Sequence, residues 1–382
     1  MSYLFEGEDH QAIRATCRKF AQAHIAPHGA DWEEAEEFPV ELYAAAAKAG
    51  VAGIGYPEAQ GGQGGDLSHV LVACEELIIS GRSVGTIVGL GTHGIALPPI
   101  VRFGTPEQQA RFVTPCLRDG KISALGITEP GGGSDVAGLT TKAERDGDHY
   151  VITGAKTFIT SGTRADFVTT AVRTGGPGHG GISLVVIEKG TPGFSVSKKL
   201  KKTGWWASDT AELHFDGCRV PVSNRIGPEN SAFPMIMMNF VAERLALAGQ
   251  CVAIAELAYR ESINYARERK VFGKPLMGMQ VTRHKLADMA SQLAAARSLT
   301  GEVCVRALRG NDPAVAGLAA KAKNVATDMC SFVCDQAVQI HGGYGYMRET
   351  LVERLYRDAR LYPIGGGTRE IMNELIAKTE GY

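Results

Sequence analysis

The chain has 382 residues, of which 44% are hydrophobic and 21% are charged, and its formal net charge at pH 7 is -1. This length suggests two or three domains, and the apolar content suffices for a large core. A nearly balanced charge gives no electrostatic reason to expect nucleic acid or an anionic membrane as a partner. The N-terminal residues lack the features of a signal peptide, and no run of about 18 apolar residues is recognised, so we expect no membrane insertion.

The eight cysteines include no C-x-x-C pair. The nearest two, Cys330 and Cys334, lie four residues apart in a segment with a helical pattern, which places both on one helix face. Buried free thiols are the simpler interpretation, and a metal or redox pair is the alternative. Scattered thiols are typical of a reducing compartment, so we expect a cytoplasmic protein without a metal site.

Residues 1–122 are rich in Ala, Glu and Leu and predict a helical domain. The clearest helical patterns are Glu8–His24, Pro39–Ala49 and Ser68–Ser80. Thr105, followed by Pro106, predicts another helix start, with Thr as the cap and Pro in the first turn.

Residues 123–235 have a pattern typical of strands, with β-branched and aromatic segments bounded by turn residues. The predicted strands are Tyr150–Thr160, Phe167–Arg173, Ile182–Glu188 and Ala211–Phe215. A helical pattern returns over residues 236–382, with helices predicted at Ala242–Arg269, Gln280–Arg309, Pro313–Gln339 and Thr368–Lys378. The expected fold class is therefore α+β, with a sheet domain between a helical domain and a helix bundle.

Two glycine-containing motifs carry most of the functional information. The first, GITEPGGGSDVAG, spans Gly126–Gly138. Its backbone N–H groups and the Ser134 hydroxyl suit a phosphate, although a tight structural turn explains three glycines equally well. The second spans Gln339–Asp358 and begins QIHGGYGY.

Both motifs resemble signatures of the acyl-CoA dehydrogenase family. Gly154–Thr160, Arg267–Gly273 and Gly365–Ile371 match other parts of the family pattern in the same order, so the resemblance covers the whole chain. It implies an N-terminal all-α domain, a middle β-barrel-like sheet domain and a C-terminal four-helix bundle. It also implies an FAD enzyme that removes the α-proton and the β-hydride of a fatty acyl-CoA thioester.

The resemblance assigns a flavin site by position. The residues expected along the isoalloxazine are Leu125, Ile127 and Thr128. Phe158 and Thr160 are expected on its other side near N5, and Gly133 and Ser134 are expected at the pyrophosphate. Ser134 is also expected to contact the substrate.

The family shares its flavin site between subunits, usually in a tetramer built as a dimer of dimers. The residues expected to reach a neighbour's cofactor are Arg269, Phe272, Gln280, Gln339 and Gly343, and those expected near the adenosine are Thr368 and Glu370. The guanidinium of Arg269 suits a diphosphate, whereas its flanking charges alone favour a solvated helix end.

The reaction needs a desolvated carboxylate base and hydrogen bonds to the enolate oxygen. Most members of the family carry a Glu in the loop before the last helix, but here that position is Gly366. The isovaleryl-CoA and long-chain branches place the Glu on an earlier helix, which points to Glu243. A Glu at a helix rim that pairs with a cation is the alternative. Arg244 matches a residue that contacts the substrate or its CoA, and the Gly366 N–H is expected to hold the thioester oxygen.

Gly365 matches a position that is often Tyr in straight-chain members, so it predicts a wider acyl pocket. A 3-methyl-branched chain of the citronellyl type is one hypothesis, and a straight medium or long chain is the other. For Trp205 and Trp206 we expect core packing or a subunit contact rather than a place at the pocket entrance. His93 lies where the family approaches the pocket, and a structural role is at least as good an interpretation. An acyl-CoA oxidase and a non-catalytic flavin or acyl-CoA binder are the rival functions. The expected electron acceptor is an electron-transferring flavoprotein.

Overall fold

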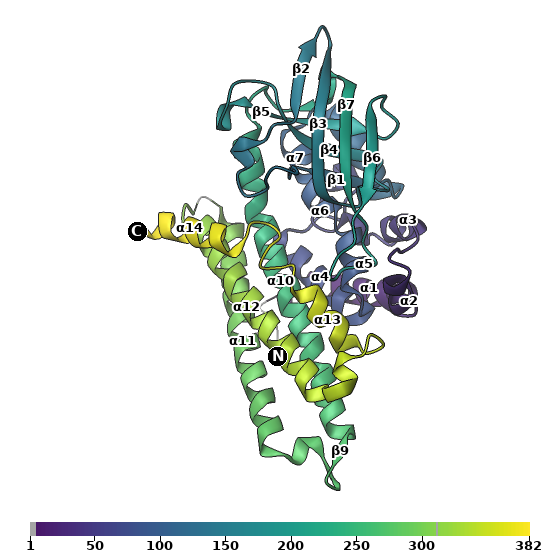
Figure 1. Ribbon diagram of the computed structural model, residues 1–382, viewed down its shortest axis with the longest axis vertical. Coiled ribbons are helices and arrows are strands. Elements are labelled where there is room, and N and C mark those ends of the chain that lie inside the picture. The colour runs from purple at the N-terminus through teal and green to yellow at the C-terminus, as the bar shows by residue number, and fades with distance from the viewer. Residues whose placement is uncertain (1–4, 311) are drawn as a thin grey trace.

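The computed structural model describes residues 5–310 and 312–382. Helices lie between Glu8 and Arg118, most strands between Ser123 and Ile226, and helices again between Ala232 and Glu380. Figure 1 shows the sheet at one end of the molecule, the N-terminal helices beside its base, and three long helices that reach the opposite end. The predicted α+β class and the order of its parts are confirmed, and the boundaries at 122/123 and 235/236 stay a prediction.

The N-terminal region contains nine helices of different lengths among the described residues. They are α1 (Glu8–His24), α2 (Gly29–Glu34), α3 (Glu41–Lys48), α4 (Leu67–Gly81), α5 (Val84–Leu90), α6 (His93–Ala96), α7 (Pro98–Phe103), α8 (Pro106–Phe112) and α9 (Thr114–Arg118). The predicted start at Thr105 is confirmed, because its hydroxyl accepts the Gln108 N–H while the Gln108 side chain accepts the Thr105 N–H.

One segment that sequence reasoning overlooked, Val84–Phe103, is long and apolar enough to cross a membrane. It forms the three short helices α5, α6 and α7 rather than one continuous rod. Because 61% of an 18-residue stretch within it is buried inside the protein, its apolar character is explained by packing.

The middle sheet has the strand order β6-β7-β3-β2-β4-β5-β8, with β1 paired in parallel to β4. Its strands are β1 (Ser123–Gly126), β2 (Lys142–Asp146), β3 (His149–Thr160), β4 (Phe167–Arg173), β5 (Ile182–Glu188), β6 (Phe194–Lys199), β7 (Thr210–Pro221) and β8 (Arg225–Ile226). Sequence reasoning missed β2 and β6 because most of their side chains face water, so neither shows a hydrophobic run.

The C-terminal region is built on three long helices, and two shorter helices pack against them. They are α10 (Ala232–Glu268), α11 (Gln280–Arg309), α12 (Val315–His341), α13 (Leu351–Ala359) and α14 (Arg369–Glu380), with a small hairpin of β9 (Lys270–Val271) and β10 (Lys274–Pro275) at the far tip (Figure 1). The prediction that α10 begins at Ala242 was wrong. Pro234 sits in its first turn, where the missing N–H costs no hydrogen bond.

Candidate active site

Glu243 lies on α10 against the loop that joins α13 to α14. Its Oε2 atom is buried and has no hydrogen-bond partner among the described residues. A Cβ atom added to Gly366 would lie 3.3 Å from Glu243 Oε1 and 2.5 Å from Leu247 Cδ1, so the carboxyl group is packed closely against the loop. Burial raises the pKa of Glu243 to about 7, although Arg244 and Lys323 act to lower it. Such a carboxyl group can exchange a proton near neutral pH.

The loop Gly365–Gly367 is held by its backbone conformation and by two cations. The second and third glycines have φ values of +65° and +97°, which side chains strongly disfavour. Lys323 Nζ, from α12, donates to the carbonyl oxygens of the first and third glycines, each at 2.5 Å. Arg244 Nε donates to the carbonyl oxygen of the second at 3.4 Å. Glu243 therefore faces a loop with a fixed backbone and no side chains.

A buried ion pair organises the glycine-rich motif that follows β1. Lys156 Nζ donates to Glu129 Oε1 at 2.8 Å and to the Ile127 carbonyl at 3.0 Å. Glu129 also accepts the backbone N–H groups of Thr140 and Thr141, at 2.7 and 2.8 Å. Burial alone would raise the pKa of Glu129, but Lys156 and these hydrogen bonds bring it down to about 2. The pair therefore joins the motif to β3 and to the start of β2.

Phe158 projects from β3 because of an irregularity in the sheet. The pairing of β3 with β7 shifts register between Lys156 and Ile159, and Phe158 has a φ of +60°. Its ring is 68% exposed, whereas Ile159 beside it is buried. The Thr157 N–H donates to the Thr128 carbonyl at 2.9 Å, so Phe158 stands next to the glycine-rich motif. A bulge that aims an aromatic ring out of a sheet is typical of a binding site.

The other predicted flavin contacts on the sheet lie at strand ends and in the glycine-rich loop after β1. Leu125, Ile127, Thr128 and Thr160 are half-buried at the ends of β1 and β3, and Gly133 and Ser134 are exposed in the loop. Thr368 caps α14 by accepting the Ile371 N–H, and Glu370 is exposed in the first turn of that helix, so both follow directly on the glycine loop beside Glu243.

A second group of predicted residues lies at the opposite end of the long helices. Arg269 ends α10, and Phe272 in the β9–β10 hairpin is 97% exposed. Gln280 begins α11, while Gln339 and Gly343 lie at the end of α12, and all three are exposed. At 1.5 Å per residue, Arg269 lies about 39 Å along α10 from Glu243. One chain therefore cannot bring both groups to one cofactor.

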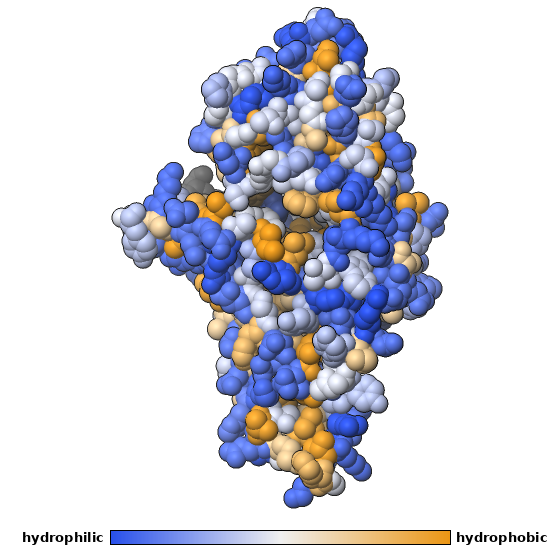
Figure 2. Space-filling model, in the orientation of Figure 1, coloured by the Kyte–Doolittle hydropathy of each residue, from blue (hydrophilic) through white to orange (hydrophobic). Residues whose placement is uncertain are grey.

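A groove of about 520 Å³ opens at this far end. Its lining includes Arg269, Gly343, Tyr265, His341 and Tyr344. Apolar residues gather at the lower tip of the face shown in Figure 2, over the region of the hairpin. This end therefore combines a cation with exposed apolar surface.

Family models match almost the entire chain. The N-terminal, middle and C-terminal domain models of acyl-CoA dehydrogenase match residues 7–119, 124–218 and 230–380. This chain belongs to the acyl-CoA dehydrogenase family. The enzyme is therefore a flavin-dependent oxidoreductase that uses FAD to dehydrogenate acyl-CoA, as predicted.

Individual relatives of this acyl-CoA dehydrogenase are similar along most of their length. The long-chain specific enzyme of Rattus norvegicus mitochondria is 40% identical over 381 residues, covering 98% of this chain and 87% of that protein. The isobutyryl-CoA dehydrogenase of Bos taurus is 37% identical, over 97% of this chain and 89% of that protein. A probable acyl-CoA dehydrogenase from Mycobacterium abscessus has a TM-score of 0.96 and 51% identity, with 98% and 99% of the two chains covered.

The residues of this acyl-CoA dehydrogenase suit a flavin at the sheet. Phe158 offers an exposed aromatic face, and the ion pair of Lys156 with Glu129 fixes the motif beside it. Gly131 and Gly132 have open space where a side chain would stand. The Gly132 N–H already donates to the Glu129 carbonyl at 3.0 Å, so the backbone that is accessible to a phosphate is that of Gly131.

Sequence reasoning missed Lys323 and the Lys156–Glu129 pair in this acyl-CoA dehydrogenase. Lys323 is 1% exposed on α12, where its buried neighbours include Ala322 and Ala326. A lysine on the apolar stripe of a helix is a usable signal, because lysine is almost never fully buried unless it is paired.

The remaining unusual side chains have packing roles. Trp205 is 8% exposed and meets Tyr362 edge-on at 5.3 Å, as core packing predicts. The Trp206 ring lies below the guanidinium groups of Arg348 and Arg357, at 4.3 and 3.9 Å. His93 is 4% exposed, and burial lowers its pKa to about 4.

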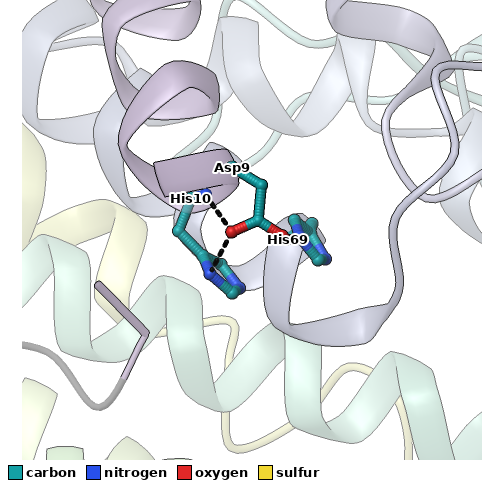
Figure 3. Close-up of side chains that lie close together, drawn as sticks. All are labelled: Asp9, His10 and His69. Carbon is teal, nitrogen blue, oxygen red and sulfur yellow. Dashed lines mark hydrogen bonds and ion pairs between the residues drawn. The ribbon is translucent and has the colours of Figure 1, made fainter. Parts of the chain in front are cut away.

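Cys330 and Cys334 are buried and form no disulfide, as the simpler interpretation of their spacing expects. Figure 3 shows a separate cluster, in which Asp9, His10 and His69 join α1 to α4. Its two imidazole rings stack at 4.1 Å with 9° between their planes, so their lone pairs lie in two separate, nearly parallel planes and cannot both point at one ion. His69 Nδ1 also accepts the Asp66 N–H as part of a capping box. Helix capping and ring stacking therefore explain this cluster.

Proposed function

We propose that Glu243 is the catalytic base of this acyl-CoA dehydrogenase and that the Gly366 N–H holds the thioester oxygen of the substrate. The observation that supports this is the buried Glu243 carboxyl group packed against a loop without side chains. Glu243 takes the α-proton, and hydrogen bonding from Gly366 stabilises the negative charge that develops on the thioester oxygen. Bound FAD supplies the hydride acceptor for the β-carbon. The product is the trans-2-enoyl-CoA.

We further propose that the acyl pocket is wide at its β and γ carbons. Gly365 has no positive φ, and a Cβ atom there would have its nearest neighbour at 3.8 Å. Neither strain nor crowding therefore requires glycine at this position, in contrast to the next two residues. A missing side chain leaves room for a 3-methyl-branched or citronellyl-type chain, and a straight medium or long chain is the alternative.

Anaerobic titration of the yellow holoenzyme with a panel of acyl-CoAs should resolve the substrate class. We expect 3-methyl-branched chains to bleach the oxidised flavin band, and Gly365→Tyr to slow this about 10–200-fold while sparing straight chains, because one misfitting group costs about 1–3 kcal/mol. Preference of the unmodified enzyme for straight chains of any length would contradict the wide pocket and leave the dehydrogenase activity standing.

We also propose that an electron-transferring flavoprotein, rather than oxygen, reoxidises the enzyme. After the flavin has been bleached, adding the flavoprotein or oxygen in separate experiments and following the return of the oxidised flavin band compares the two reoxidation rates. Faster return with the flavoprotein supports the proposal.

We propose that the flavin site is completed by a partner subunit in a homotetramer, in a cytoplasm that keeps all eight cysteines reduced. The separation of about 39 Å between Glu243 and Arg269 supports this, because each chain then contributes opposite ends of its long helices to two sites. Arg269 and the exposed Phe272 would serve the neighbour's cofactor.

Mixing two inactive variants tests the shared site. Glu243→Gln removes the base, and Arg269→Glu repels the pyrophosphate without disturbing the fold, because the Arg269 side chain is exposed. In a mixed dimer of these variants, one site keeps both native residues. Random pairing should therefore restore about a quarter of the wild-type activity after co-expression. If each chain forms its own site, the co-expressed variants will stay as inactive as either alone.

A further inference from the structure

Lys323 is a buried cation that no sequence motif explains. Its side chain is 1% exposed, and burial lowers the pKa of its ammonium to about 8. Withdrawing an ammonium from water costs several kcal/mol unless hydrogen bonds and charges compensate. The partners here are two backbone carbonyls of the glycine loop, Gly365 and Gly367. These contacts therefore indicate that the buried ammonium of Lys323 serves the glycine loop.

The hydrogen bonds of Lys323 fix the direction of a nearby N–H group. A trans peptide is planar, so its C=O and N–H bonds point in opposite directions, and no cis bond occurs among the described residues. The Gly365 carbonyl points at Lys323, so the N–H of Gly366, in the same peptide unit, points away from it. Within residues 5–310 and 312–382, this N–H has no hydrogen-bond acceptor. It is thus a preset donor, ready for a ligand.

The same ammonium acts on Glu243. The charged groups that influence this carboxyl group are Arg244 on its own helix and Lys323 on α12, and both favour its ionised form. The glycine loop, which packs against it from the third side, carries no charged side chain. Arg244 is also committed to the loop through the Gly366 carbonyl. Both cations therefore link the loop to the carboxyl group, and Lys323 is the one that does so from a second helix, α12.

We propose that Lys323 is a positioning residue for the reaction: it aims the Gly366 N–H at the thioester oxygen, and its positive charge beside the loop that packs on Glu243 favours the carboxylate form of that base. The inference rests on the proposed roles of Glu243 and Gly366. Its two parts are separable, because one depends on hydrogen-bond donors and the other on charge.

Three substitutions separate these parts. Lys323→Met removes both the donors and the charge, Lys323→Gln keeps donors without the charge, and Lys323→Arg keeps the charge in a bulkier group. Lys321, two residues earlier on α12, is half-exposed and pairs with Glu380 at the surface. Lys321→Met is therefore a matched control with the same chemical change outside the site.

The readout is the rate of flavin reduction by acyl-CoA in the holoenzyme as a function of pH. In the wild type, the rate should rise with pH through about 7, as Glu243 loses its proton. Loss of the nearby cation should move this rise about one pH unit higher in Lys323→Gln, which amounts to about a tenfold lower rate at pH 6. Lys323→Met should show the same shift and a further loss of about 10²-fold at high pH, from a misaligned donor. Lys323→Arg and Lys321→Met should keep the wild-type midpoint.

Infrared titration gives a second readout that does not require turnover. The band of the protonated Glu243 carboxyl group, assigned by its absence in Glu243→Gln, should persist about one pH unit higher in Lys323→Gln. An unchanged midpoint in both measurements would overturn the electrostatic role, even if Lys323→Met fails to fold. Equal rates at high pH for folded Lys323→Met and wild type would overturn the orienting role. Failure of the proposed function would give a different result. The flavin of the wild-type enzyme would not be reduced by acyl-CoA, or the flavin of Glu243→Gln would be reduced at the wild-type rate.

Discussion

Replacing Glu243 with Gln should lower the rate of flavin reduction by acyl-CoA about 10²–10⁴-fold, the usual contribution of a positioned general base. Gln has the same shape as Glu but cannot accept the α-proton, and the loop Gly365–Gly367 offers no other carboxyl group. Because the Gly366 N–H and the sheet residues remain in place, FAD content and acyl-CoA affinity should stay within a few-fold of wild type. Stopped-flow reduction and equilibrium titration measure the two quantities separately.

A matched control is Glu302→Gln on α11, where Glu302 is exposed and pairs with Arg306. This variant should reduce its flavin at the wild-type rate. Wild-type rates in Glu243→Gln would instead reject the base assignment. A joint loss of reduction and of FAD would show that Glu243 supports the structure of the site rather than its chemistry.

Replacing Lys156 with Met should lower the free energy of unfolding by about 3–5 kcal/mol, because it leaves the buried Glu129 carboxylate without its counter-charge. Lys156 is fully buried, and it joins the glycine-rich motif to β3 through Glu129 and the Ile127 carbonyl. The motif should loosen with it, so FAD should dissociate at lower urea concentrations than in the wild type. Urea unfolding followed by circular dichroism and by flavin fluorescence measures both effects.

Two further variants make this result specific. In Lys156→Met/Glu129→Gln no unpaired charge remains, so the double variant should recover part of the lost stability. Lys121→Met breaks an ion pair with Asp166 at the surface, where one partner is 53% exposed, and should cost less than about 1 kcal/mol. Equal costs for the buried and the surface pair would mean that burial of the Lys156 pair adds nothing to stability.

The parts of the fold that could be predicted are those whose hydrophobic pattern is unambiguous. Glu8–His24, Phe167–Arg173 and Gln280–Arg309 have the predicted bounds because each ends at a change of pattern. The start of α10 was missed because Pro234 resembles a helix breaker until its place in the first turn is known. The edge strand β6 was missed because its side chains are mostly exposed, so tertiary pairing rather than local pattern makes it a strand.

The candidate site divides in the same way. Glu243 and Gly366 could be predicted as partners from family motifs, and the structure places them together. Lys323 could not, because its role depends on a contact between α12 and a loop 42 residues further along the chain. The distance of Arg269 from Glu243 could be predicted, because the helix expected over Ala242–Arg269 already contained both residues, and α10 is unbroken between them.

The three consecutive glycines of the loop also set a conflict between rigidity and substrate range. Glycine loses more conformational entropy on folding than any other residue, so ordering this loop is unusually costly. A larger residue normally reduces that cost by about 0.4–1 kcal/mol, but only where the native φ allows a side chain. Gly366 and Gly367 are excluded by their positive φ, and Gly365 alone could be replaced without strain. The one position at which the loop could be made stiffer is thus the position that the proposed wide pocket needs to be without a side chain. Under that proposal, selection for heat resistance and selection for bulky substrates would act in opposite directions on a single residue.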